Sequence, residues 1–165
     1  MLKKILKRTF QILLLVFIII QFIRPAKNKA DGISKNDISK LYAVPADVQS
    51  ILKTSCYDCH SNNTDYPWYA RVQPVAWWLN NHIQDGKKDL NFSEFGSYRI
   101  MRQYKKLEQI NDLVKNDDMP LDSYLWIHKN AKLNEQQKLT LGNWVVAVRD
   151  TIKATYPADS LVRKK

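Results

Sequence analysis

Hydrophobic and polar residues follow a helical spacing along most of this chain. Apolar residues recur three or four positions apart, as they do on the buried face of an α-helix. The clearest stripe consists of Leu141, Trp144, Val145, Val148 and Ile152. We therefore predict an all-α fold.

Four amphipathic helices follow from this spacing and from residues that typically open a helix. They are predicted from Pro45 into Cys56, from Pro74 to near Gly86, over residues 98–115, and from Asn134 onward. Asn134 and Gln137 have the spacing of a capping box, which makes the last of these starts the best defined. Residues 90–95 are expected to form a turn and the start of a short helix.

An uncharged, largely apolar run at residues 10–23 predicts a membrane anchor. It follows the basic segment Met1–Arg8 and ends before Arg24-Pro25, which is the layout of an export signal. A helix over residues 9–23 would be about 22 Å long, against a hydrocarbon core of about 30 Å, and basic residues at its ends could offset part of that mismatch. We expect an uncleaved, single-pass anchor in the cell inner membrane, with the following domain in the periplasm. A cleaved export signal is the alternative.

The net charge of +10 suggests nucleic-acid binding until the basic residues are located. Residues 1–29 carry seven of them and no acidic residue, and Arg163, Lys164 and Lys165 end the chain. Removing these ten from the 26 basic residues leaves 16, the number of acidic residues. The folded part is therefore close to neutral, and we expect no nucleic-acid partner.

The most specific signal is Cys56-Tyr57-Asp58-Cys59-His60, which contains both cysteines of the protein. A Cys-x-x-Cys-His segment is the attachment signature of c-type haem. Two thiols three residues apart on a helical turn can each bond one haem vinyl group, and the next imidazole can reach the iron. Cys56 and Cys59 are thus the expected covalent attachment points, and His60 the expected proximal ligand. A redox thiol pair, a disulfide, or a zinc site completed by histidines are the alternatives for this spacing.

Met119, which Pro120 follows, is the expected distal ligand. A methionine held outside a regular helix by a proline can project its thioether toward the open side of a haem. His82 is the alternative, because it lies on the apolar face of the helix that begins at Pro74. It could equally be a structural histidine bonded to a backbone carbonyl or to a haem propionate. Met101 is expected in the core.

With these motifs in place, the chain resembles the haem-binding domain family, a group of exported, c-type cytochrome-like proteins of Bacteroidetes type. The resemblance covers about residues 40–152. It rests on Cys56–His60, Tyr66–Tyr69, Pro74–Leu79 with His82, Leu90–Glu94, and Met119-Pro120 with Leu133 onward. It implies a cytochrome c-like helical fold. Trp68, Tyr69, Trp77 and Trp78 are candidates for packing against the haem, and ordinary core packing explains each of them equally well.

These features divide the chain into an anchor at 1–25, a linker at 26–44, a c-type haem-binding domain at 45–155 and a basic tail at 156–165. We expect a membrane-tethered protein with one covalent haem c that transfers electrons between redox partners, and not an enzyme. The alternatives are a haem-based sensor of small ligands and a peroxidase-like enzyme. Either would need an open sixth position on the iron.

Overall fold

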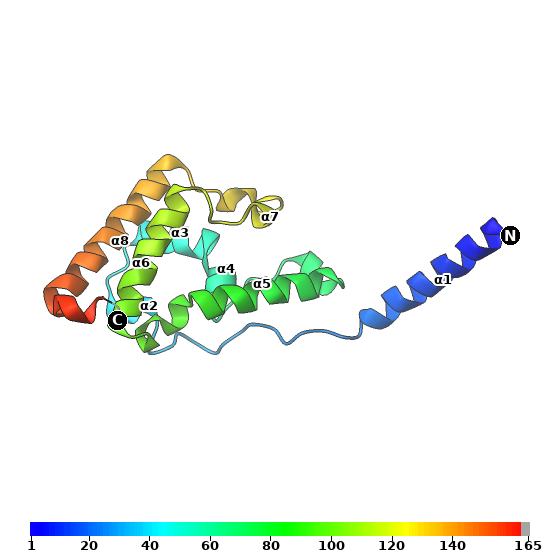
Figure 1. Cartoon of the computed structure of the whole chain (residues 1–165), viewed down its shortest axis with the longest axis horizontal. Helices are drawn as coiled ribbons and strands as arrows, with labels where there is room; N and C mark the ends of the chain where they lie inside the picture. Colours follow the sequence, from blue (N-terminus) through cyan, green and yellow to red (C-terminus); the bar gives the residue numbers. More distant parts are fainter. Residues whose placement is uncertain (163–165) are drawn as a thin grey trace.

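The computed structural model describes residues 1–162, and every regular element among them is helical (Figure 1). The all-α prediction is therefore confirmed. The longer helices are α1 (Leu2–Ile20), α3 (Ala46–Ser55), α5 (Val75–Asp89), α6 (Ile100–Lys115) and α8 (Glu135–Thr155). The shorter ones are α2 (Ile38–Leu41), α4 (Tyr57–His60) and α7 (Asp122–Leu125), with 3-10 turns η1 (Trp68–Arg71), η2 (Phe92–Ser97), η3 (Lys129–Ala131) and η4 (Ala158–Ser160). The basic residues of the predicted tail, Arg163 to Lys165, lie outside the described residues.

The four predicted amphipathic helices are present as α3, α5, α6 and α8. α8 begins with the predicted capping box, in which the Asn134 side chain accepts from the Gln137 amide and the Gln137 side chain accepts from the Asn134 amide. α5 does not end near Gly86 but continues to Asp89. Gly86 therefore lies inside α5 and not at its end. A glycine occupies this position because α5 and α4 come very close together there, as described below.

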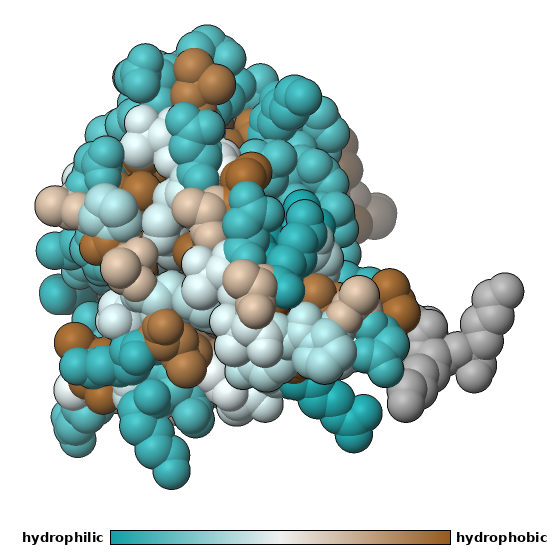
Figure 2. Space-filling view, turned by 90° about the vertical axis from the view of Figure 1, so that its left-hand side faces the viewer, coloured by the Kyte–Doolittle hydropathy of each residue, from teal (hydrophilic) through white to brown (hydrophobic). Residues whose placement is uncertain are grey.

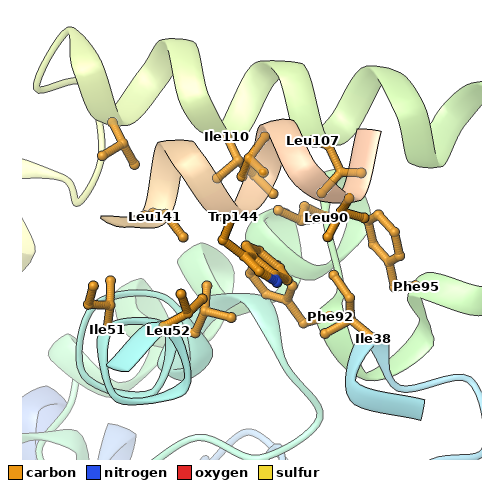
Figure 3. Close-up of a cluster of buried hydrophobic side chains, with 14 of the residues drawn as sticks. Ile38, Ile51, Leu52, Leu90, Phe92, Phe95, Leu107, Ile110, Leu141 and Trp144 are labelled. Atoms are coloured by element: carbon orange, nitrogen blue, oxygen red, sulfur yellow. The ribbon is translucent and has the colours of Figure 1, made fainter. Parts of the chain in front are cut away.

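One hydrophobic core joins α3, α6, α8 and η2 (Figure 3). Trp144 of α8 lies among Leu52, Phe92 and Ile110, and it is 6 % exposed. Its indole nitrogen donates to the Ala43 carbonyl at 2.9 Å, so the buried polar atom has a partner. This core forms a rigid base from which α4 and α5 extend.

α1 projects away from the domain, at the end farthest from α8 (Figure 1). It begins at Leu2, because the basic and apolar residues before Thr9 are also good helix formers, and its side chains are exposed up to Ile19. Within residues 1–162, no helix combines the length and the apolar character needed to span a membrane.

The segment between α1 and α3, predicted as a linker, lies along the helical domain (Figure 1). Ile38 is fully buried in the core, and Asn28 is 8 % exposed. The Asn28 side chain donates to the Ser61 carbonyl and to the Thr64 hydroxyl, both at 2.9 Å. A polar segment with one buried isoleucine has no periodicity, which is why the sequence suggested a free tether.

The side of the domain farthest from α1 is largely hydrophilic, and its hydrophobic residues are scattered (Figure 2). Isolated apolar residues of this kind are normal on a solvated surface. The candidate site lies elsewhere, where α4 meets α5.

Candidate functional site

His60 is the most firmly oriented of the predicted site residues. Its Nδ1 lies 2.9 Å from the Leu90 carbonyl oxygen and 3.0 Å from the Gly86 carbonyl oxygen. A carbonyl oxygen only accepts hydrogen bonds, so Nδ1 carries the proton. In the neutral ring, the other nitrogen, Nε2, is then the one that can bind a metal. Hydrogen bonding from one ring nitrogen to a backbone carbonyl is how proteins orient a histidine that ligates metal.

A close approach between α4 and α5 makes this orientation possible. A Cβ placed on Gly86 would lie 2.8 Å from the Cys59 carbonyl oxygen and 3.3 Å from the Cys59 Cβ. Only a glycine allows α5 to come so near to the attachment motif. The same residue supplies one of the two carbonyl groups that hold His60.

Cys56 and Cys59 are free thiols, of which Cys56 lies at the junction of α3 and α4 and Cys59 lies within α4. Burial raises the pKa of Cys56 to about 12, with a smaller effect from Cys59. Burial also raises the pKa of Cys59 to about 11, with a smaller effect from Asp58. Redox-active cysteine pairs depend on a lowered pKa, so these thiols do not fit that interpretation. Within residues 1–162, no group of three or more His, Cys, Asp or Glu side chains is arranged to hold a metal ion.

A hollow of about 290 Å³ opens beside the attachment motif, between α4, α5 and the residues that follow α6. Cys56, Cys59 and His60 are among its walls, and so are both candidate distal ligands, Met119 and His82. A smaller hollow of about 60 Å³, lined mainly by apolar side chains, shares Cys56, His60 and Met119 with it. The structure therefore brings together all five residues that the sequence named as attachment points or iron ligands.

Met119 lies in an ordered turn after α6. The amides of Asp118 and Met119 both donate to the Leu113 carbonyl, at 2.9 and 3.2 Å, and Asp117 has a left-handed φ of 60°. An aspartate tolerates that conformation at a helix end. Met119 itself is half-buried and packs against the core. This turn fixes where the thioether can reach.

His82 is held by its own helix. Its Nδ1 lies 2.9 Å from the Trp78 carbonyl oxygen, and its ring lies against the Trp78 indole with centroids 4.2 Å apart. The first contact is the backbone bond expected of a structural histidine, and in the neutral ring it makes Nε2 the nitrogen that can bind a metal. Both interpretations of His82 therefore stay open.

Tyr124 is a cavity residue that the sequence did not single out. Its hydroxyl donates to Asp58 Oδ2 at 2.7 Å, and burial, followed by this hydrogen bond, raises its pKa far above the ordinary value. The His128 ring stacks on Tyr124 at 4.2 Å, and His128 Nε2 lies 2.7 Å from the Tyr69 hydroxyl. A tyrosine five positions after a methionine has no recognisable pattern, so only the fold could identify it.

The aromatic residues named as candidates for packing against the haem are not among the walls of this hollow. Trp68 is 77 % exposed and Trp78 is 45 % exposed. Neither of them, nor Trp77 or Tyr69, lines the hollow at Cys59.

The residues at this site fit a c-type haem. Two neutral thiols three positions apart face one hollow with a histidine whose Nε2 is free, and a thioether and a second imidazole lie on the same walls. These are the donor types that hold haem in proteins of the cytochrome c type.

One family model, described as a haem-binding domain, matches residues 15–147. The match includes every candidate ligand and most of the domain. No curated protein and no solved structure matches the chain.

Proposed function

Because the chain belongs to the haem-binding domain family, we propose that it is a c-type cytochrome-like electron carrier with one covalently attached haem. The observation that carries the proposal is the orientation of His60, whose Nδ1 proton is directed to two backbone carbonyls. The proposal includes a cytochrome c-like arrangement of the helices around the cofactor, and it does not include an enzymatic activity.

In this proposal, Cys56 and Cys59 attach the haem through two thioether bonds, and His60 Nε2 is the proximal ligand. The raised pKa values keep both thiols protonated until attachment, and this makes a competing disulfide slow to form. The Leu90 and Gly86 carbonyls hold the proton on His60 Nδ1, which also makes Nε2 a stronger donor.

We assign the distal position to Met119 and treat His82 as its competitor, because both line the same hollow. The turn that holds Met119 is tied to the Leu113 carbonyl and lies next to the core. His82 sits on α5, where Trp78 restricts its ring. A thioether ligand favours a higher reduction potential than a second imidazole does.

When bound, haem supplies a one-electron exchange between ferrous and ferric iron. The chain contributes the ligands, the apolar side chains that keep water away and the surface on which a partner docks. Its partners would be redox proteins.

We also propose that α1 attaches the protein to the cell inner membrane and that the domain faces the periplasm. Support comes from the uncharged residues 10–23, which lie after a basic segment and of which residues 10–19 are exposed on α1. In this proposal, the haem is attached to Cys56 and Cys59 after the domain has been exported.

The test is the visible absorption spectrum of the full-length holoprotein, recorded oxidised, reduced, and reduced with carbon monoxide. A low-spin spectrum that carbon monoxide does not change, with the weak far-red band of sulfur-to-iron charge transfer, is expected. A high-spin spectrum that shifts with carbon monoxide would instead indicate an open position, and hence sensing or catalysis. Absence of covalent haem would refute the proposal.

Two substitutions separate the distal candidates. Met119→Ala should remove the far-red band and let carbon monoxide bind, whereas His82→Ala should leave both unchanged. Met101→Ala is the matched control, because Met101 lies in α6 and does not line the hollow. If His82 were the ligand, the wild type would lack the far-red band, and His82→Ala, not Met119→Ala, would let carbon monoxide bind. His60→Ala should impair haem retention, and a normal holoprotein from this variant would contradict the proximal assignment.

A further inference from the structure

A second hollow, of about 360 Å³, lies beside the end of α1, between residues 24–27, η1 and the start of α5. It shares no wall with the hollow at His60. Ala70 and Ala76 line it, and their small side chains leave the space open. The remaining walls include five residues that can donate hydrogen bonds, namely Arg24, Lys27, Tyr66, Arg71 and Asn80.

The chain between Arg24 and Lys27 is fixed at both ends. Before it, the Ile23 carbonyl accepts from the Gln73 side chain at 2.8 Å and from the Trp77 indole at 2.9 Å. Gln73 is 1 % exposed, so this contact is anchored within the fold. After it, the Asn28 amide donates to the Tyr66 hydroxyl at 2.7 Å. Residues 24–27 are thus held across the opening between η1 and α5.

The hollow has positive charge without a compensating negative charge. No carboxylate is among its walls. Within residues 1–162, neither Arg24, Lys27 nor Arg71 forms an ion pair. Arg24 uses its Nε to donate to the Gln21 carbonyl at 3.1 Å, and its terminal guanidinium nitrogens remain for another acceptor.

The two neutral donors complete this set. The Tyr66 hydroxyl accepts from the Asn28 amide, so its own proton can be donated elsewhere. Asn80 lies on α5, half-buried at the wall of the hollow, and its amide group supplies two further hydrogens. A site with three cations and two neutral donors, and with no carboxylate, is complementary to a multidentate anion.

We propose that this hollow binds a phosphate group. Phosphate oxygens only accept hydrogen bonds, and the guanidinium groups of arginine match their geometry in pairs. The group could belong to an anionic phospholipid or to a soluble phosphate. The lipid source is favoured by the residues between α1 and the hollow, where Phe22 is 83 % exposed and Ile23 is 57 % exposed. Only this choice of source rests on the membrane attachment proposed above.

The test is isothermal titration calorimetry on the full-length protein in neutral detergent micelles, with two titrants. One is a short-chain phosphatidylglycerol, and the other is inorganic phosphate. The test variant carries Arg24→Gln, Lys27→Gln and Arg71→Gln together. The control variant carries Lys35→Gln, Lys40→Gln and Lys115→Gln, which remove the same charge from exposed positions that do not line the hollow.

We expect phosphatidylglycerol to bind about a hundredfold more weakly to the test variant than to the wild type, from three basic contacts at a membrane surface. The control variant should bind as the wild type does. If inorganic phosphate shows the same dependence, the site takes a soluble phosphate and the lipid source is wrong. If neither titrant binds, or if the two variants behave alike, the phosphate site is refuted.

Circular dichroism of both variants checks that the fold is retained. The calorimetric result does not depend on the haem, because it is a comparison of surface variants of one chain. A failed haem spectrum would therefore refute the electron carrier and leave the phosphate site standing. A failed titration would refute the phosphate site and leave the proposed electron carrier standing.

Discussion

Replacing Gly86 with alanine tests the close contact on which the candidate site depends. In an ordinary helix interior this change is stabilising by about 1 kcal/mol, because glycine has the greater backbone entropy in the unfolded chain. At Gly86 the new Cβ would lie 2.8 Å from the Cys59 carbonyl oxygen. That oxygen belongs to the backbone of α4, so α4 or α5 has to move.

Forcing one extra carbon into a tightly packed place costs about 1–3 kcal/mol. Subtracting the gain in helix propensity leaves an expected net loss of about 1 kcal/mol in the free energy of unfolding for Gly86→Ala. The displaced helix would also lengthen the hydrogen bond from His60 Nδ1 to the Gly86 carbonyl. The Leu90 carbonyl would then be the remaining acceptor.

Gly142→Ala in α8 is the matched control. Its Cβ would also lie 2.8 Å from an oxygen, but this one is Oδ1 of the Asn111 side chain, and the next atom is 4.0 Å away. A side chain can rotate where a backbone cannot, so this variant should keep a gain of up to about 1 kcal/mol. The two variants should therefore differ by about 2 kcal/mol.

Urea unfolding of the full-length protein, followed by far-ultraviolet circular dichroism, measures this difference. The midpoint should fall for Gly86→Ala and rise or stay constant for Gly142→Ala, with equal slopes. If both variants are stabilised, the contact between Gly86 and Cys59 is not limiting, and the reasoning about α5 is wrong.

Three further predictions concern the fold around the site, and each is measured by urea unfolding. Glu94 has a lowered pKa, mainly because the Asn36 side chain donates to its carboxylate. Ionised Glu94 therefore stabilises the fold fully above its ordinary pKa of about 4.3. This stabilisation is lost as the pH falls through the lowered pKa. Glu94→Gln should thus cost about 1 kcal/mol at neutral pH and progressively less below about pH 4, and a constant difference would contradict the assigned cause. Ile38→Ala should cost about 3 kcal/mol as a buried truncation, whereas the exposed Ile33→Ala in the same segment should cost less than about 0.5 kcal/mol; equal effects would mean that the segment is not docked. Tyr124→Phe should cost about 1 kcal/mol through its lost hydrogen bond. The control is Tyr104→Phe in α6, whose hydroxyl forms no hydrogen bond within residues 1–162, and an equal cost for both variants would show that the Tyr124 bond contributes nothing.

The parts of this protein that the sequence predicted are those with a repeating physical signal. α6 and α8 bury Leu107 and Val145 on the faces that the spacing indicated. The capping residues around Asn134 follow from the need to satisfy the first amides of a helix. Cys56 to His60 could be proposed as a haem-attachment motif from the sequence alone, because the chemistry of attachment fixes the spacing of these residues.

The rest of the site has no such signal, since backbone atoms supply much of it. The Gly86 and Leu90 carbonyls orient His60, and any residue type has a carbonyl. The close approach at Gly86 depends on where α4 lies in space, so the glycine looked like a helix end. The docking of Asn28 depends on partners more than thirty residues away, and this distance in sequence hides it from any local pattern.

The docked segment also has a kinetic consequence. A flexible chain the length of residues 26–44 would let the domain sweep through about 22–26 Å. The domain holds this segment at Ile23, Asn28 and Ile38. The volume that the domain could otherwise explore around α1 is therefore largely removed. If the protein is the tethered electron carrier proposed above, its domain stays in one place relative to α1, and a redox partner would have to diffuse to it.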